Sequence, residues 1–201
     1  MEKPDKPNGV IALGVDPGTR HLGWGIVSLD GNRLRHVAHG VIDADPAFRL
    51  ERRLTIIDRE LGEVVARYRP SVGSVESLFF HRDAQAAAKL GHARGVVLLA
   101  LARANVDIVE YAPAHVKRVI AGKGNATKDQ VALMIRTLLG IDAPPRSDAA
   151  DALALAVTHC RRVPLDAAIG RQPRTPPDPR VARLIGAGRG RRGVGRRAFG
   201  S

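Results

Sequence analysis

The sequence has a single cysteine, few aromatic residues and no long apolar run. Seven of its 201 residues are Phe, Trp or Tyr and one is cysteine. No disulfide can therefore form within the chain, and the lone thiol, Cys160, fits a reducing compartment. The longest strongly apolar stretch, 96–102, is far shorter than the roughly 20 residues of a membrane-spanning helix, and the charged, proline-containing N-terminus lacks a signal-peptide pattern. We therefore expect a cytoplasmic protein without a membrane partner.

Positive charge is abundant but concentrated at one end of the chain. The 32 Lys and Arg exceed the 20 Asp and Glu, for a net charge of +12. Residues 161–201 contain 11 Arg and 2 Asp and carry +9, whereas residues 1–160 carry only +3. The C-terminal segment is rich in Pro and Gly without an apolar repeat, a composition typical of disorder. We expect a flexible N-terminus at 1–8, one domain at 9–160 and a basic disordered tail at 161–201.

Apolar periodicity predicts an α/β domain. Strands at 10–15, 22–29 and 33–41, the last two joined by the turn signal Asp30-Gly31-Asn32, predict an antiparallel meander. Beyond it we expect helices at 47–68, 83–105, 127–139 and 147–160, and strands at 71–78 and 107–112. This order implies a mixed five-stranded sheet flanked by helices.

Four carboxylates stand where such a fold gathers functional groups. Asp16 follows the first strand, Glu76 lies late in the fourth, and Asp148 and Asp151 are three residues apart on the last helix, a spacing that puts both on one helical face. Ordinary explanations exist, since Asp-Pro-Gly is common turn chemistry, Glu76 suits the surface of an edge strand, and acids in a first helical turn stabilise the helix dipole. The Ala- and Leu-rich sequence around the helical pair nevertheless predicts burial, which is costly for unpaired carboxylates.

Carboxylates brought together in this way need a counter-charge. Two of them at about 4 Å repel by roughly 4 kcal/mol at an effective dielectric near 20. Oxygen-only ligands select hard cations such as Mg²⁺ or Mn²⁺, and the Cys and His spacing of a zinc site is missing. The pattern therefore predicts a two-metal centre that hydrolyses phosphodiesters.

Four spaced motifs resemble the RuvC family of Holliday-junction resolvases. They are Gly14-Val15-Asp16-Pro17-Gly18-Thr19-Arg20, Val75-Glu76-Ser77-Leu78-Phe79, Lys89-Leu90-Gly91-His92-Ala93-Arg94-Gly95 and Asp148-Ala149-Ala150-Asp151-Ala152-Leu153-Ala154. The resemblance covers about residues 10–160. It implies an RNase H-like fold, a homodimer, and Mg²⁺-dependent paired nicking of four-way DNA junctions in homologous recombination and DNA repair.

The same resemblance matches Asp16, Glu76, Asp148 and Asp151 to the family's metal-binding acids. We therefore expect these residues to be catalytic and to hold two Mg²⁺ ions per subunit, with Mn²⁺ able to substitute. Ser77 stands where the family often has Gln, which puts any cleavage-sequence preference in doubt. The resemblance says nothing about the tail, and the sequence leaves open whether a branch-migration motor complex docks on the protein.

Aromatic and basic residues near these motifs are candidate DNA contacts. Phe79 and Phe80 directly follow the strand expected at 71–78. Two consecutive residues in a strand point to opposite faces, so we expect one ring to project outward and stack on an unpaired base, and the resemblance favours Phe79. A basic, Gly-containing loop leads into the helix at 127–139, whose N-terminus suits either a phosphate or plain solvent. The remaining candidates are Arg82, Lys117, Arg118, Lys123 and Lys128, among which the resemblance favours Lys117 and Lys128.

The apolar helix expected at 83–105 needs a second burial surface and is the candidate dimer interface. Three other functions compete with the junction resolvase. An RNase H-like nuclease for another structured nucleic acid would use the same acids. An actin-like ATPase or sugar kinase would explain Asp-x-Gly-Thr after a first strand but needs a second lobe. A non-catalytic DNA-binding protein would use the basic tail but has no need for four acids.

Overall fold

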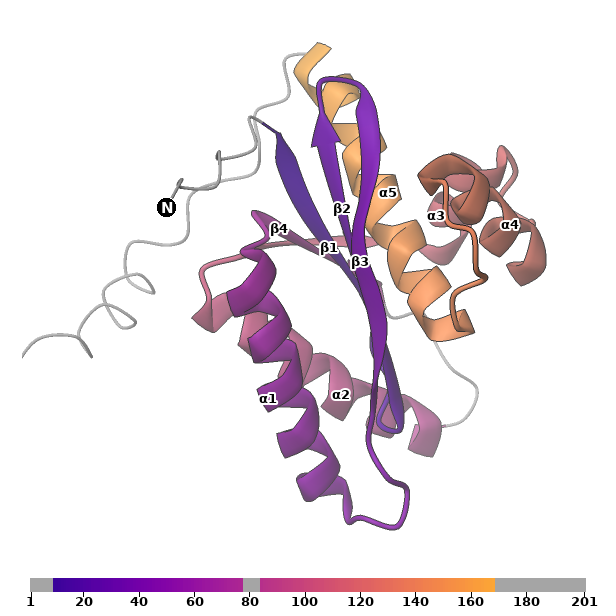
Figure 1. Ribbon diagram of the computed structural model, residues 1–201. Helices are drawn as coiled ribbons and strands as arrows, with labels where there is room; N and C mark the ends of the chain where they lie inside the picture. The colour runs from indigo at the N-terminus through magenta and orange to yellow at the C-terminus, as the bar shows by residue number, and fades with distance from the viewer. Residues whose placement is uncertain (1–8, 78–83, 169–201) are drawn as a thin grey trace, which may run out of the picture.

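The sheet of the computed structural model combines an antiparallel meander with two parallel strands (Figure 1). Its strands are β1 (Val10–Asp16), β2 (His21–Asp30), β3 (Arg33–Asp43), β4 (Val72–Glu76) and β5 (Asp107–Tyr111). They lie in the order β3-β2-β1-β4-β5, with β1 antiparallel to β2 and parallel to β4. Gly31 adopts a left-handed φ of 57° in the β2–β3 turn, as hairpin turns require. The predicted mixed five-stranded sheet is confirmed.

The structure describes residues 9–77 and 84–168. Phe79, Phe80 and Arg82 fall in the gap between these ranges, and the segments 1–8 and 169–201 lie beyond them. The expectations about these residues, including disorder of the tail, are therefore outside the part of the chain described below. Among the described residues no helix is long and apolar enough to cross a membrane.

Within residues 9–77 and 84–168, five helices cover the two faces of the sheet. They are α1 (Leu50–Tyr68), α2 (Ala84–Arg103), α3 (Pro113–Ala121), α4 (Lys128–Leu139) and α5 (Ser147–Ala168). α1 and α2 pack together on one face, whereas α5 crosses the other face and carries α3 and α4 on its outer side (Figure 1). The α4 start predicted from Thr127 is confirmed, because Thr127 and Gln130 form a reciprocal capping box that satisfies free backbone N–H groups.

Two helix predictions were incomplete. The helix α3 was missed, although Pro113 occupies a first-turn position and Gly122 closes the helix at φ 77°, the usual punctuation of a helix. Lys117 and Arg118 therefore lie on a helix rather than in the expected loop. The last helix does not stop near Cys160 but continues to Ala168, into the segment whose composition had suggested a tail.

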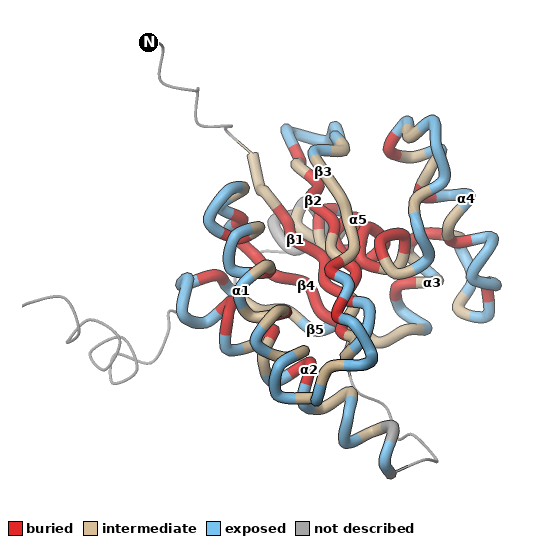
Figure 2. Tube along the Cα trace, turned by 60° about the horizontal axis from the view of Figure 1, so that its bottom comes forward, coloured by how far each residue is buried: buried red, intermediate tan, exposed pale blue. Residues whose placement is uncertain are grey.

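The sheet separates two apolar cores. Leu13 and Val15 of β1 face α1 and α2 and pack with residues such as Ile57 and Leu101. Ala12, by contrast, packs with the α3–α5 core, because side chains alternate between faces along a strand. Asp16 has the same parity as Ala12 and so belongs to the α5 face. Figure 2 shows that buried residues concentrate in β1, β4 and α5.

Candidate metal centre

Asp16 and Glu76 lie side by side at the ends of two parallel strands. Asp16 is the last residue of β1 and Glu76 is the last residue of β4. The two strands pair with Val15 opposite Val75, so the next residues, Asp16 and Glu76, follow in the same register. Both side chains belong to the face covered by α5, since side chains two residues apart share a face.

Strand glycines bring the two helical carboxylates to this edge. A Cβ atom built on Gly14 would lie 1.8 Å from the carbonyl oxygen of Ala152, and one built on Gly23 would lie 1.9 Å from that of Asp148. Only glycine permits so close an approach. Gly23 is the antiparallel partner of Asp16, so the start of α5 lies beside Asp16. These glycines were not among the predicted site residues, although a glycine inside a strand pattern signals close backbone approach.

The electrostatics of Asp16 show that the four carboxylates interact. Burial, followed in order of size by the charges of Asp151, Glu76 and Asp148, raises the pKa of Asp16 from 3.8 to about 7. Among the residues that the structure describes, Lys128 is the one whose charge opposes the rise. The structure therefore brings together all four acids that the sequence singled out, from β1, β4 and α5.

Lys128 is a cationic partner of this cluster. Its Nζ donates a hydrogen bond to Oδ2 of Asp151 at 3.0 Å. This hydrogen bond, followed by the charge of Asp151 and by smaller attractions to Asp16 and Glu76, raises the pKa of Lys128. Since Lys128 is the first residue of α4, the capping box of that helix fixes the point from which its side chain reaches the acids.

The donor set fits hard divalent cations. Its ligands would all be carboxylate oxygens, which Mg²⁺ and Mn²⁺ prefer, and one ammonium balances only part of the negative charge. Within residues 9–77 and 84–168, no three His, Cys, Asp or Glu side chains converge closely enough to enclose an ion. The carboxylates therefore interact through their charges, and Asp151 is engaged by Lys128.

The loop after Asp16 is held by α1. Arg53 Nη1 donates a hydrogen bond to the carbonyl oxygen of Thr19 at 3.0 Å. A Cβ atom on Gly18 would lie 2.1 Å from the carbonyl oxygen of His21, so this tight turn requires glycine. These contacts fix the chain immediately beyond Asp16. The Asp-Pro-Gly motif therefore forms a structural turn and also holds a candidate catalytic residue.

A three-residue ion cluster ties the start of α5 to the sheet. Arg146 donates two hydrogen bonds to Asp43, at 2.6 and 3.0 Å, and Nδ1 of His21 lies 2.6 Å from Oδ1 of Asp43. The hydrogen bonds from Arg146 and His21 lower the pKa of Asp43 to about 2. Arg146 immediately precedes α5, so the cluster helps to place Asp148. The cluster was not predicted, because its members are far apart in the chain.

The basic DNA-contact candidates among the described residues lie on α3, on α4 and in the loop between these helices. Lys117 and Arg118 lie on α3, and Lys123 lies in the loop between α3 and α4. Arg118 is exposed at the surface. Among these candidates, Lys128 has a direct bond to one of the four carboxylates.

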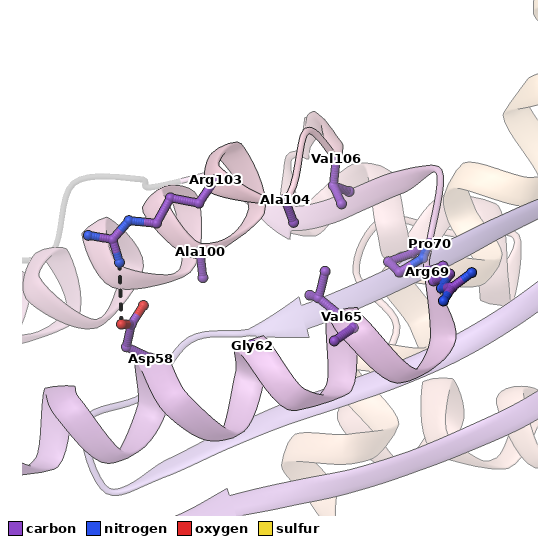
Figure 3. A pocket seen from close by; sticks show the side chains of 10 residues that line it. Asp58, Gly62, Val65, Arg69, Pro70, Ala100, Arg103, Ala104 and Val106 are labelled. Atoms are coloured by element: carbon purple, nitrogen blue, oxygen red, sulfur yellow. Dashed lines mark hydrogen bonds and ion pairs between the residues drawn. The ribbon is translucent and has the colours of Figure 1, made fainter. Parts of the chain in front are cut away.

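A groove between α1 and α2 is unrelated to these acids (Figure 3). Val65, Ala100 and Val106 line it, and an ion pair between Arg103 and Asp58, at 3.4 Å, lies at one end. The groove lies on the face opposite α5 and contains none of the candidate catalytic residues. The groove is therefore separate from the carboxylate cluster at the strand ends.

Comparison with known proteins gives a consistent result. The family model described as crossover junction endodeoxyribonuclease RuvC matches residues 12–159. The protein of that description from Sorangium cellulosum is 57% identical over 85% of this chain and 94% of its own length. The one from Acidiphilium cryptum is 50% identical over 75% of this chain and 90% of its own.

Solved structures agree with these sequence matches. The Thermus thermophilus RuvC structure in complex with a Holliday junction substrate superposes with a TM-score of 0.72 at 39% identity, covering 81% of this chain and 97% of its own. A yeast mitochondrial Holliday junction resolvase, at 14% identity and a TM-score of 0.55, covers 79% of this chain and 82% of its own. At that identity the likeness concerns the fold alone.

Proposed function

The chain belongs to the RuvC family of crossover junction endodeoxyribonucleases, and from that membership we propose the residues and the metal through which it resolves Holliday junctions. The protein is a structure-selective endonuclease of homologous recombination and DNA repair, with the RNase H-like fold of its family. The family is metal-dependent. We assign the metal to Asp16, Glu76, Asp148 and Asp151 and propose two Mg²⁺ ions per subunit, replaceable by Mn²⁺.

The observation that carries this assignment is the elevated pKa of Asp16. Three acids raise it together with burial, and among the described residues the ammonium of Lys128 opposes them. A cluster of this kind is stabilised by cations. Glycines that let α5 pack against β1 and β2 keep the acids together. Without a bound cation, the repulsion between these acids lowers the stability of the fold.

In the proposed reaction, water attacks the phosphorus of a junction strand and one P–O bond breaks. The four carboxylates hold and orient the cations, and burial of Asp16 limits access of bulk water. When bound, a pair of divalent cations lowers the pKa of water and stabilises the leaving oxygen. Lys128 contributes an ammonium beside the four acids. This ammonium can bind a DNA phosphate in place of the Asp151 carboxylate.

DNA contacts are proposed along α3 and the start of α4. Lys117, Arg118, Lys123 and Lys128 supply the positive charge needed to bind the phosphate backbone. Lys128 supports this arrangement best, because it already couples the α4 start to the acids. Phe79, Phe80 and Arg82 complete the proposal from the sequence, with Phe79 as the ring that stacks at the junction centre. Because bacterial DNA lies in the cytoplasm, we propose that the protein acts there.

We also propose a homodimer, because two coordinated nicks require two active sites. The outer face of α2 supports it. Ala88, His92, Gly95 and Leu99 are exposed at helical spacing, and Leu99 is 48% exposed although it is a large apolar residue. Cβ atoms built on Gly91 and Gly95 would meet nothing within 4 Å, so this side of the helix leaves room for a second chain. A branch-migration motor complex is a further candidate partner.

Cleavage of a synthetic four-way junction with Mg²⁺ tests the proposal. Duplex, fork and structured RNA of the same length serve as controls. We expect paired nicks confined to the junction, and Asp16→Asn, Glu76→Gln and Asp151→Asn should each lose them. Equal cleavage of the duplex would contradict junction selectivity, and cleavage of RNA alone would favour the other RNase H-like function.

A further inference from the structure

Arg94 of α2 is a buried cation bound to the end of β4. Its side chain is 7% exposed, and Nη2 lies 2.6 Å from Oε1 of Glu110, which is 48% exposed. The other terminal nitrogen, Nη1, donates a hydrogen bond to the backbone carbonyl oxygen of Glu76. A buried guanidinium is costly unless its N–H groups are satisfied. Arg94 thus joins α2, β4 and β5 at the position of a proposed metal ligand.

The alternation of hydrogen bonds along β4 explains why the Glu76 carbonyl needs such a donor. The N–H of Ser77 donates to the carbonyl of Tyr111 in β5 at 2.9 Å. Successive backbone groups of a strand point to opposite sides, so the N–H and carbonyl of Glu76 point toward β1. With Val15 opposite Val75, the N–H expected to reach that carbonyl belongs to residue 17.

Residue 17 is proline and has no N–H. The ladder between β1 and β4 therefore loses its last bond at the place where Asp16 and Glu76 end their strands. Arg94 supplies the missing donor from the opposite face of the sheet. Its planar fork reaches the carbonyl and the Glu110 carboxylate together, which a lysine ammonium on a flexible stem does not reproduce.

We propose that Arg94 is a positioning residue for the metal site: it replaces the hydrogen bond that Pro17 cannot make and so fixes the backbone of Glu76. This inference rests on the proposed function, because it takes Glu76 to be a metal ligand. Arg94 faces the α1–α2 core rather than the acids, so its effect passes through the strand end. Outer partners of this kind change metal affinity by about 10–100-fold when removed.

The first test measures Mn²⁺ binding by calorimetry on the full chain without DNA. Arg94→Met is expected to weaken Mn²⁺ binding by about 10–100-fold, and Arg94→Lys is expected to recover less than half of the loss on a logarithmic scale. Arg103→Met is the matched control, because Arg103 lies on the same helix in an exposed ion pair with Asp58; it should stay within about twofold of wild type. Unchanged Mn²⁺ binding in a folded Arg94→Met variant would overturn the proposal.

The second test uses Pro17 itself. Pro17→Ala restores an N–H at residue 17. The factor by which Arg94→Met weakens Mn²⁺ binding should therefore be at least threefold smaller in the Pro17→Ala background than in wild type. A double-mutant cycle measures this difference. A residue that merely fills space in the core would cost the same in both backgrounds, and that result would refute the positioning role. If Arg94→Met does not fold, Arg94→Lys is compared in the same two backgrounds.

Glu76→Gln separates this inference from the function on which it rests. If Glu76→Gln weakens Mn²⁺ binding and folded Arg94→Met does not, Arg94 has no positioning role while the metal assignment stands. If Glu76→Gln leaves Mn²⁺ binding unchanged, the assignment of Glu76 fails and the inference fails with it. We expect both variants to weaken binding. In Arg94→Met we also expect faster hydrogen exchange at the Ser77 amide, which reports the strand end directly.

Discussion

The ammonium of Lys128 lies 3.0 Å from the carboxylate of Asp151, and this pair joins the start of α4 to the first turns of α5. One residue thus links the basic surface proposed to hold DNA with the acids proposed to hold metal. The same ammonium is attracted to Asp16 and Glu76. We therefore expect a divalent cation and a DNA phosphate to compete for the two partners of a single ion pair.

Lys128→Met should separate these two roles. Without the ammonium, Asp151 is available to a cation and the cluster becomes more negative, so Mn²⁺ should bind the DNA-free protein about two- to fivefold more tightly. Junction affinity should fall, because a phosphate contact is lost. Calorimetry and junction titration measure the two effects. Lys123→Met, in the α3–α4 loop, should weaken junction binding alone, and weaker Mn²⁺ binding in Lys128→Met would argue against competition.

The raised pKa of Asp16 predicts a specific pH dependence of stability. Because this pKa is about 7 in the folded chain and near 4 when unfolded, the folded state binds more protons between these values. The free energy of unfolding contributed by Asp16 therefore falls as pH rises from 4 to 7.

Asp16→Asn removes this penalty. In EDTA at pH 8 its Tm should exceed that of wild type by about 5 °C, and the difference should vanish near pH 4. Asp142→Asn, at an exposed position after α4, is the control and should show no such trend. A Tm difference for Asp16→Asn that is independent of pH would show that burial and neighbouring acids do not control this carboxyl.

The strand glycines should be essential for the helix position. Gly14→Ala places a methyl carbon 1.8 Å from the Ala152 carbonyl oxygen, so α5 must move away from β1, with a loss of several kcal/mol in the free energy of unfolding. Gly62→Ala in α1 is the matched control, because a Cβ atom there meets nothing within 4 Å. It should stabilise by about 0.5–1 kcal/mol. Equal denaturant midpoints for the two variants would contradict this packing.

The α2 face gives a prediction about oligomeric state. Leu99→Glu should convert the proposed dimer to a monomer in sedimentation experiments, since it buries a charge at the proposed interface. It should leave the fold intact because Leu99 is already 48% exposed. Leu133→Glu on α4, where Leu133 is 60% exposed, is the control and should remain dimeric. A dimeric Leu99→Glu variant would exclude this face.

The sequence was sufficient to predict elements with strong local signals. The hairpin at Asp30-Gly31-Asn32, the capping box at Thr127 and the all-round apolar α5 each carry their own pattern, and the mixed sheet follows from their order. The proximity of Asp16, Glu76, Asp148 and Asp151 was also expected, because strand ends and helix starts of such sheets meet at one edge.

Features that depend on distant partners were not predictable. Arg146, Asp43 and His21 form one cluster although they are far apart in the chain, and no periodicity marks them. The fork of Arg94 depends on a proline in another strand. The helix α3 was missed for a different reason: its nine residues are too few for a convincing apolar repeat, so the basic residues suggested a loop.

The most direct test of the account compares wild type and Asp16→Asn on one labelled four-way junction, with binding and Mg²⁺-dependent nicking measured in the same preparation. Asp16→Asn should bind the junction within about threefold of wild type and lose cleavage by at least about a thousandfold, the loss expected when a cation site at the reacting phosphate is broken. Substantial nicking by Asp16→Asn would contradict the central claim that this carboxylate cluster is the catalytic metal centre.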